Sequence, residues 1–368
     1  MNAMTINLET PCVVVDAGRL RRNVLAMAER IAAFGVALRP HAKTHKTPEI
    51  ARMQLDAGAV GVTVAKLSEA EVMERGGIGD IFIAYPIVDP GKLERAVRLR
   101  ERVALTLGVD SMEGAERLAR AAAARGVRMP VRLEADTGLR RTGVSFDDAV
   151  ALAGRLASMA PLDFRGIYTF RGHLMNGRPT LDVEAAGLEE GRLMVSLAER
   201  IRASGVAVRD VSVGSTPTAA YAAQIPGVTE VRPGTYVFYD RMQARLGACD
   251  LSDCAAKVRV TVVSRPAPDY VVVDGGSKTF ATDVQPNAEP LRLEGFGHVE
   301  ELPHAVLERL SEEHGMVRIR PEDDVSVGDA LHIVPNHICS TVNLHNRIAL
   351  IDGDDVNVIP VAARGMLA

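Results

Sequence analysis

Residues 60–84, which read VGVTVAKLSEAEVMERGGIGDIFIA, decide the fold class. Two short runs rich in β-branched residues, 60–64 and 81–84, enclose a segment, 68–76, whose apolar residues recur at helical spacing. A strand, a helix and a second strand in this order form the repeating unit of parallel sheets. We therefore expect a parallel sheet whose strands are joined by helices.

The same alternation extends in both directions, from residue 13 to about residue 232. The expected strands are short and apolar, and a helix-like segment follows each one; they cover residues 38–41, 60–64, 81–84, 103–107, 131–134, 166–170, 211–213 and 230–232. Eight such strands favour a (β/α)8 barrel over a doubly wound sheet, which more commonly has about five to seven strands. Residues 12–16 would then form an extra strand that precedes the barrel.

The pattern changes after about Tyr239. Short β-rich segments, separated by Pro, Gly and Asp turns, cover residues 256–264, 270–274, 316–319, 330–334, 348–351 and 357–361. Only residues 305–312 have the pattern of a helix, and residues 275–294 are expected to form a loop. We therefore predict two domains, a barrel over residues 1–245 and a mainly β domain over residues 246–368.

Composition and charge exclude several classes of protein. The 368 residues carry 43 Lys and Arg against 47 Asp and Glu, a net charge of −4, and include no Trp. A chain without a basic field and with few aromatic platforms is not expected to bind nucleic acid. The first residues, MNAMTINLETP, lack the features of a secretory signal, and no apolar run approaches the ~20 residues of a membrane span. Four cysteines are too few for a disulfide framework, which is typical of a reducing cytosol. We therefore expect a cytoplasmic protein, and the lack of a long apolar run predicts no membrane contact.

A cationic segment follows the first expected barrel strand, where barrels place catalytic residues. Residues 39–46 read RPHAKTHK, with Lys43 at the centre. Neighbouring cations lower the pKa of a lysine by repulsion, which suits an amine that forms a Schiff base. A solvated basic loop is the alternative interpretation.

The loops after strands seven and eight read GSTPT (214–218) and RPGTY (232–236). Barrels often bind phosphate here, because backbone N–H groups and hydroxyls converge beside a helix N-terminus. Ordinary turns have the same composition. However, an aldehyde cofactor anchored by a phosphate requires both a lysine and a phosphate site, and the sequence offers both.

Six motifs occur in a fixed order: Thr10-Pro11, residues 39–46, residues 214–218, residues 232–236, Glu-His-Gly at 313–315 and Pro-Asn-His-Ile-Cys at 335–339. Together they resemble the D-threonine aldolase and D-serine dehydratase family, over nearly the whole chain from Thr10 to Gly365. The resemblance implies the alanine-racemase fold, a pyridoxal 5′-phosphate (PLP) cofactor on Lys43, and a homodimer.

The resemblance also implies roles for single residues. Arg141 would approach the hydroxyl of the cofactor ring, Tyr168 would reach the cofactor from a strand end, and the phosphate would be surrounded by Gly214, Ser215, Thr216, Gly234 and Tyr236. His173 could be a general base for a substrate hydroxyl, or only part of the polar surface. The roles of His41, His45 and His314 stay open.

His337 and Cys339 form a second group of interest. On an extended strand, residues i and i+2 point to the same side, so an imidazole and a thiolate at this spacing can bind one divalent ion. A buried core pair is the alternative. The resemblance adds a divalent metal here, with His-x-Cys in dehydratases and His-x-Asp in aldolases. Cysteine favours Zn²⁺, whereas aspartate suits Mn²⁺ or Mg²⁺.

These features predict a PLP- and metal-dependent lyase for β-hydroxy-D-amino acids. Residues 264–269 and 341–345 look more like the aldolases, which cleave D-threonine-type substrates to glycine and an aldehyde. Cys339 instead argues for a dehydratase, which converts D-serine or D-threo-3-hydroxyaspartate to a keto acid and ammonia. An amino-acid racemase, a non-catalytic PLP carrier and a phosphosugar-binding barrel are weaker alternatives.

Overall fold

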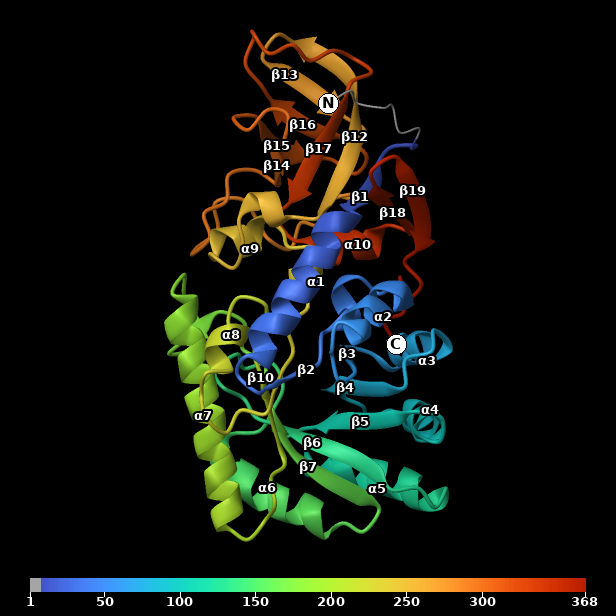
Figure 1. Cartoon of the computed structure of the whole chain (residues 1–368), viewed down its shortest axis with the longest axis vertical. Helices are drawn as coiled ribbons and strands as arrows, with labels where there is room; N and C mark the ends of the chain where they lie inside the picture. Colours follow the sequence, from blue (N-terminus) through green and yellow to red (C-terminus); the bar gives the residue numbers. More distant parts are fainter. Residues whose placement is uncertain (1–7) are drawn as a thin grey trace. The chain divides into compact units, whose positions relative to one another are not determined.

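The computed structural model of the protein describes residues 8–368, and Figure 1 traces its helices and strands. The chain forms two compact units. The barrel unit comprises Leu25–Lys43, Thr47–Gly234 and Met366–Ala368, and the β unit comprises the residues up to Val24, Thr44–Lys46 and Thr235–Gly365. Helix α1 (Ala17–Ala32) contributes residues to both.

An eight-stranded parallel sheet forms the centre of the barrel unit. Its order is β2-β11-β10-β7-β6-β5-β4-β3, and its strands are β2 (Ala37–Leu38), β3 (Val62–Val64), β4 (Asp80–Pro86), β5 (Ala104–Val109), β6 (Met129–Glu134), β7 (Leu162–Tyr168), β10 (Asp210–Val213) and β11 (Glu230–Val231). A parallel bridge between His41 and Thr63 joins the two end strands, so the sheet curls round onto itself. The barrel predicted from the sequence is confirmed.

Helices follow the strands of this sheet, as Figure 1 shows for α3 to α7. They are α2 (Pro48–Asp56), α3 (Leu67–Arg75), α4 (Pro90–Arg100), α5 (Met112–Ala124), α6 (Phe146–Ser158), α7 (Val183–Ala203) and α8 (Ala219–Ala222). Side chains cap the starts of α4 to α7; for example, Ser111 accepts a hydrogen bond from the Gly114 N–H, and Ser145 accepts one from the Asp148 N–H. A short hairpin, β8 (Leu174–Met175) and β9 (Arg178–Pro179), lies between β7 and α7.

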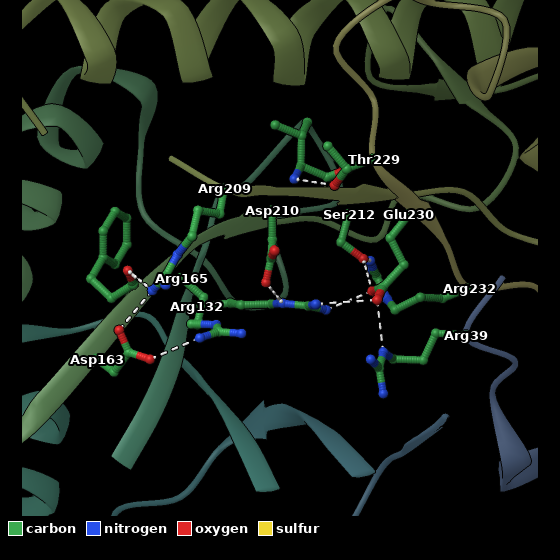
Figure 2. Close-up of polar contacts among 12 residues, drawn as sticks. Arg39, Arg132, Asp163, Arg165, Arg209, Asp210, Ser212, Thr229, Glu230 and Arg232 are labelled. Atoms are coloured by element: carbon green, nitrogen blue, oxygen red, sulfur yellow. Dashed lines mark hydrogen bonds and ion pairs between the residues drawn. The ribbon is translucent and has the colours of Figure 1, made fainter. Parts of the chain in front are cut away.

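Buried ion pairs lie in the barrel interior near the N-terminal ends of its strands (Figure 2). Glu230 lies 2.5 Å from Arg132 and 2.7 Å from Arg39, and all three side chains are buried. Burial alone would raise the pKa of Glu230, but the charges of Arg132 and Arg39 hold it well below its usual range. Asp210 and Asp80 extend the network to Arg132 and Arg39 respectively.

A nine-stranded sheet dominates the β unit. Its order is β13-β16-β15-β14-β17-β12-β1-β18-β19, and its strands are β1 (Cys12–Asp16), β12 (Ala256–Ala267), β13 (Tyr270–Val273), β14 (Gly297–Val299), β15 (Val306–Leu310), β16 (Gly315–Arg318), β17 (Ala330–Pro335), β18 (Arg347–Asp352) and β19 (Asp355–Pro360). Pairing of β13 with β12 closes part of this sheet into a ring. Two helices, α9 (Arg241–Arg245) and α10 (Ile338–Leu344), also belong to the unit, so the mainly β C-terminal region is confirmed.

Two details of the predicted fold are wrong. Strand β1 forms as expected but does not lead into the barrel, because it pairs antiparallel with β12 and parallel with β18. Residues 305–312 were expected to be helical, yet they contain β15. Pairing with β16, through a bulge between Leu307 and Arg309, buries the consecutive side chains Val306 and Leu307 and overrides their helix-like spacing.

No helix in residues 8–368 combines the length and the apolar character needed to cross a bilayer.

Candidate active site

A cavity of about 510 Å³ opens at the C-terminal ends of the barrel strands. Its walls come from several strand ends, and the lining residues are His41, Lys43, Ala65, Lys66, Ala84, Tyr85, Glu134, Arg141, Thr142, Tyr168, Phe170 and Arg232. Three residues predicted for the cofactor site, Lys43, Arg141 and Tyr168, therefore lie together. This is the end of a barrel where enzymes place their chemistry.

Lys43 lies in a short 3-10 turn, η1 (Ala42–Thr44), which directly follows β2. The backbone N–H of Lys43 donates to Nδ1 of His41 at 3.3 Å, so His41 helps to order this turn. The Lys43 Nζ lies 5.1 Å from the centre of the Phe170 ring, and Cζ of Arg141 lies 5.2 Å from the same centre. One aromatic ring thus holds two cations in the cavity wall.

Tyr168 and Glu134 form the polar floor of the cavity. The Tyr168 hydroxyl donates to one carboxyl oxygen of Glu134 at 2.9 Å, and the Thr142 hydroxyl donates to the other at 2.9 Å. Burial raises the pKa of Glu134, although both hydroxyls and Arg141 oppose the rise. Burial and the neighbouring carboxyl raise the pKa of Tyr168 well above its usual value, so its phenol keeps its proton.

The 214–218 loop turns the chain from β10 into α8. Gly214 has a φ of +83°, which favours glycine, and a Cβ at this position would lie 3.1 Å from Cα of Ala219. The next residue, Ser215, donates its backbone N–H to the Thr218 hydroxyl at 3.1 Å. The backbone thus approaches the start of α8 closely, in the manner of phosphate-binding turns.

The second predicted phosphate loop meets the first. The backbone N–H of Gly234 donates to the Thr216 hydroxyl at 3.2 Å. The structure therefore brings together Gly214, Ser215, Thr216 and Gly234, although none of them lines the cavity described above. Tyr236 lies in a 3-10 turn, η2 (Thr235–Val237), of the β unit and is fully buried.

His173 follows β7 and does not line the cavity. Its side chain is half-buried, and burial lowers its pKa below the usual value. A neutral imidazole could accept a proton, and the role of His173 as a general base stays a prediction.

His337 and Cys339 do not lie on a strand, which corrects the argument from alternating side chains. Strand β17 ends at Pro335, His337 is the N-cap residue of α10, and Cys339 lies in the first turn. The reason is a contact with a distant part of the chain: the Asp240 carboxylate accepts the Ile338 N–H at 3.0 Å, which starts a helix where a strand was expected.

The two side chains nevertheless interact at the start of this helix. Burial opposes charge on both side chains, but Cys339 and Asp283 raise the pKa of His337 well above its usual value, and His337 lowers the pKa of Cys339. The His337 Nδ1 lies 2.6 Å from an Asp283 carboxylate oxygen, and the Cys339 Sγ lies 3.1 Å from the Thr44 hydroxyl. All four residues belong to the β unit.

Comparison with known proteins decides the family. Residues 15–242 match the alanine racemase N-terminal domain, and residues 255–351 match a putative serine dehydratase domain. The chain belongs to the D-threonine aldolase and D-serine dehydratase family. This family consists of fold-type III PLP enzymes, as the motifs predicted.

Relatives with different reactions cover more than nine-tenths of the chain. D-threo-3-hydroxyaspartate dehydratase from Delftia sp. is 36% identical over 93% of this chain and 93% of its own length, and D-threonine aldolase from Arthrobacter sp. is 32% identical over 97% and 93%. Among solved structures, D-threonine aldolase from Filomicrobium marinum has a TM-score of 0.89 at 30% identity, covering 98% of this chain and 97% of its own. Both aldolases and dehydratases are lyases.

The residues present fit the cofactors of this family. A lysine amine lies in the cavity, and a glycine-led turn with serine and threonine hydroxyls supplies donors of the kind that phosphate needs. For a metal, imidazole and thiolate are suitable soft donors, and Asp283 fixes the orientation of the His337 ring. No group of three or more His, Cys, Asp or Glu side chains within residues 8–368 is arranged to hold an ion. His337 and Cys339 as metal ligands stay a prediction.

Sequence analysis missed several residues of the cavity wall in this family member. Lys66 and Tyr85 were not considered, although the Lys66 Nζ lies 3.7 Å from the centre of the Tyr85 ring. Phe170 and Glu134 end two of the expected strands, residues 166–170 and 131–134, but received no role. All four lie at or just past the end of a strand, β3, β4, β6 or β7, so a search of every strand end would have found them.

Proposed function

We propose that the protein is a PLP- and divalent-metal-dependent lyase that acts on β-hydroxy-D-amino acids. The observation that carries this proposal is the cavity at the strand ends, where Lys43 lies beside Arg141 and the pair of Tyr168 and Glu134. The 214–218 loop and Gly234 supply donors for the phosphate. The relatives named above act on substrates of this class.

Each part of the chain has a distinct task in this proposal. Bound PLP acts as an electron sink that weakens the bonds at Cα of an amino acid. Lys43 holds the cofactor aldehyde and is the amine of the cavity that can move a proton at Cα. Tyr168 stays protonated at neutral pH, and its hydroxyl donates a hydrogen bond to Glu134 rather than to solvent. His337 and Cys339 hold the divalent ion, a Lewis acid for the substrate hydroxyl.

Retro-aldol cleavage of D-threonine-type substrates is the reaction that the sequence favours. Dehydration is the second candidate, and Cys339 favours it. Two solved structures of D-threo-3-hydroxyaspartate dehydratase are variants of this kind: one is a cysteine-to-alanine variant in a metal-free form, and the other is a histidine-to-alanine variant. Their two substituted positions are separated by one residue, as His337 and Cys339 are.

A product assay tests the proposal. Purified enzyme, loaded with PLP and Zn²⁺ or Mn²⁺, is incubated with D-threonine, D-serine and D-threo-3-hydroxyaspartate, with the L-enantiomers as controls. Glycine with an aldehyde identifies the aldolase, and ammonia with a keto acid identifies the dehydratase. Racemisation of D-alanine without either set of products would contradict a lyase.

The metal part of the proposal has its own test. Cys339→Ala should remove the bound metal and the lyase activity while the visible absorption of the cofactor stays, because other loops hold the cofactor. Treatment with EDTA should have the same effect, reversed by Zn²⁺ or Mn²⁺. Stoichiometric metal and full turnover in Cys339→Ala would place the ion elsewhere. We also expect a cytoplasmic homodimer, which sedimentation and fractionation can test.

A further inference from the structure

A carboxylic acid is buried directly behind the 214–218 loop. Glu190 lies on α7 and has no exposed surface. The Gly214 backbone N–H donates to its Oε1 at 3.2 Å, and the Thr218 hydroxyl lies 3.4 Å from its Oε2. Both partners belong to the loop proposed to bind the cofactor phosphate.

Cations lie near Glu190, but their hydrogen bonds go elsewhere. Arg171, which is fully buried after β7, pairs with Glu189 at 3.0 Å. Arg232, after β11, donates to the Ser212 hydroxyl and to the Thr169 carbonyl. Helix α8, which packs against α7, carries no charged side chain. Within residues 8–368, Glu190 therefore has neutral hydrogen-bond partners and no ion pair.

A chain of hydroxyls leads from Glu190 to Ser215. The Thr218 Oγ1 lies 2.9 Å from Oγ of Ser215, and it also accepts the Ser215 backbone N–H at 3.1 Å. When Glu190 is ionised, the Thr218 hydroxyl donates to the carboxylate, and the Ser215 hydroxyl donates to Thr218 or to the Gly172 carbonyl, which lies 3.4 Å away. When Glu190 carries a proton, it donates to Thr218, Thr218 donates to Ser215, and the Ser215 proton becomes available to a ligand.

We propose that Glu190 is a positioning residue for the cofactor phosphate, and that it takes up a proton from solvent when the phosphate binds. The neutral acid directs the hydroxyl of Ser215 towards the ligand and removes a negative charge from behind a phosphate dianion. This inference rests on the proposed cofactor site and deepens it.

The electrostatics of the site agree with this role. Burial raises the pKa of Glu190 to about 7, although the Gly214 N–H and the charges of Arg232 and Arg171 oppose the rise. A nearby phosphate dianion raises the pKa further. A group whose pKa rises on binding favours binding at low pH, so affinity should fall as the pH increases above 7.

Pyridoxine 5′-phosphate is a suitable probe, because it carries the phosphate but has no aldehyde for Lys43. Calorimetric titrations of the full-length apo protein at pH 7.5 and 8.5, each in two buffers of different ionisation enthalpy, give the dissociation constant and the number of protons taken up. The variants are Glu190→Gln and the control Glu199→Gln, which removes an exposed carboxylate further along the same helix. Circular dichroism confirms that each variant is folded.

The wild-type protein and Glu199→Gln should take up about one proton at pH 8.5. Between pH 7.5 and 8.5 their dissociation constants should rise by about fivefold to tenfold more than that of Glu190→Gln. Protonation of the ligand itself contributes equally to the titrations of all the proteins, so it does not affect the comparison between them. Should Glu190→Gln not fold, Thr218→Val interrupts the same chain and should also remove the proton uptake. Equal binding and equal uptake in wild type and variants would overturn the inference, whereas no binding by the wild type would overturn the cofactor site.

Discussion

Buried charged groups have different partners at the two ends of the barrel. At the N-terminal ends of the strands, a cavity of about 360 Å³ is lined by arginines and carboxylates, and Glu230 contacts Arg132 at 2.5 Å and Arg39 at 2.7 Å (Figure 2). At the C-terminal ends, Lys43 faces an aromatic ring, and Glu134 takes its hydrogen bonds from hydroxyls.

We therefore call the N-terminal end of the barrel, where carboxylates pair with arginines, the structural end. The C-terminal end, where the candidate active site lies, is the chemical end. Ion pairing holds the pKa of Glu230 below its usual range, so that carboxylate stays charged at every physiological pH. Without a paired cation, the pKa of Glu134 is raised, and that carboxyl is closer to exchanging a proton. Perturbed groups of the second kind gather where enzymes move protons.

The largest expected effect is at the chemical end. Lys43→Ala should abolish turnover and the visible absorption of the cofactor, because alanine has no amine to hold the cofactor aldehyde. Lys66→Ala, which removes a second lysine of the same cavity, is the matched control and should keep the absorption. Absorption spectra and turnover of both variants check this. Loss of the chromophore only in Lys66→Ala would transfer the role to Lys66.

The next effect concerns the structural end. Glu230→Gln leaves Arg39 and Arg132 buried without their shared carboxylate, which should lower the free energy of unfolding by about 3–5 kcal/mol. Because the pKa of Glu230 is depressed in the folded state, its contribution is present above the pKa of the unfolded chain and is lost as the pH falls below about 4. Urea denaturation at pH 7 and pH 3.5 measures the change in the free energy of unfolding and its dependence on pH. A decrease of less than about 1 kcal/mol at pH 7 would refute a structural role.

A smaller effect is expected at the 214–218 loop. Gly214→Val forces a β-branched residue into a φ of +83° and towards Ala219, which displaces the donors for the phosphate. Loss of one charge-assisted hydrogen bond, about 1.5–3 kcal/mol, should raise the PLP dissociation constant by about tenfold or more. Fluorescence titration measures this constant. An unchanged affinity would place the phosphate elsewhere.

The smallest effect tests the comparison directly. Glu134→Gln replaces a carboxyl whose partners are hydroxyls, and an amide can still accept from one of them, so stability should change by less than about 1 kcal/mol. Activity should fall, because the group next to Tyr168 can no longer hold a proton. If Glu134→Gln destabilised the fold as much as Glu230→Gln, the two ends would not differ in kind.

Most of the barrel could be predicted because buried parallel strands are apolar runs with helices between them. All eight strands were found near their observed positions. The errors fall where tertiary pairing decides: β1 enters a sheet formed mostly by residues far along the chain, and β15 is a strand because β16 lies beside it. Likewise, α10 starts after β17 because Asp240, almost 100 positions earlier, caps it.

The candidate site could be predicted in part for a similar reason. Lys43 and the 214–218 loop lie directly after strands, so the barrel rule and the family motifs both point to them. Glu190 could not be found in this way. It lies in the middle of α7, among acidic residues such as Glu184 and Glu189, and only the packed structure shows that it is buried behind the loop.

The central claim, that Lys43 holds the cofactor at the chemical end of the barrel, has one direct test. The purified holoenzyme is reduced with borohydride, digested with a protease and mapped by mass spectrometry, so that any lysine bound to the cofactor is marked permanently. We predict that the label lies on the peptide that contains Lys43 and on no other. A label on Lys66 or another lysine, or a protein with full turnover and no labelled lysine, would contradict the account.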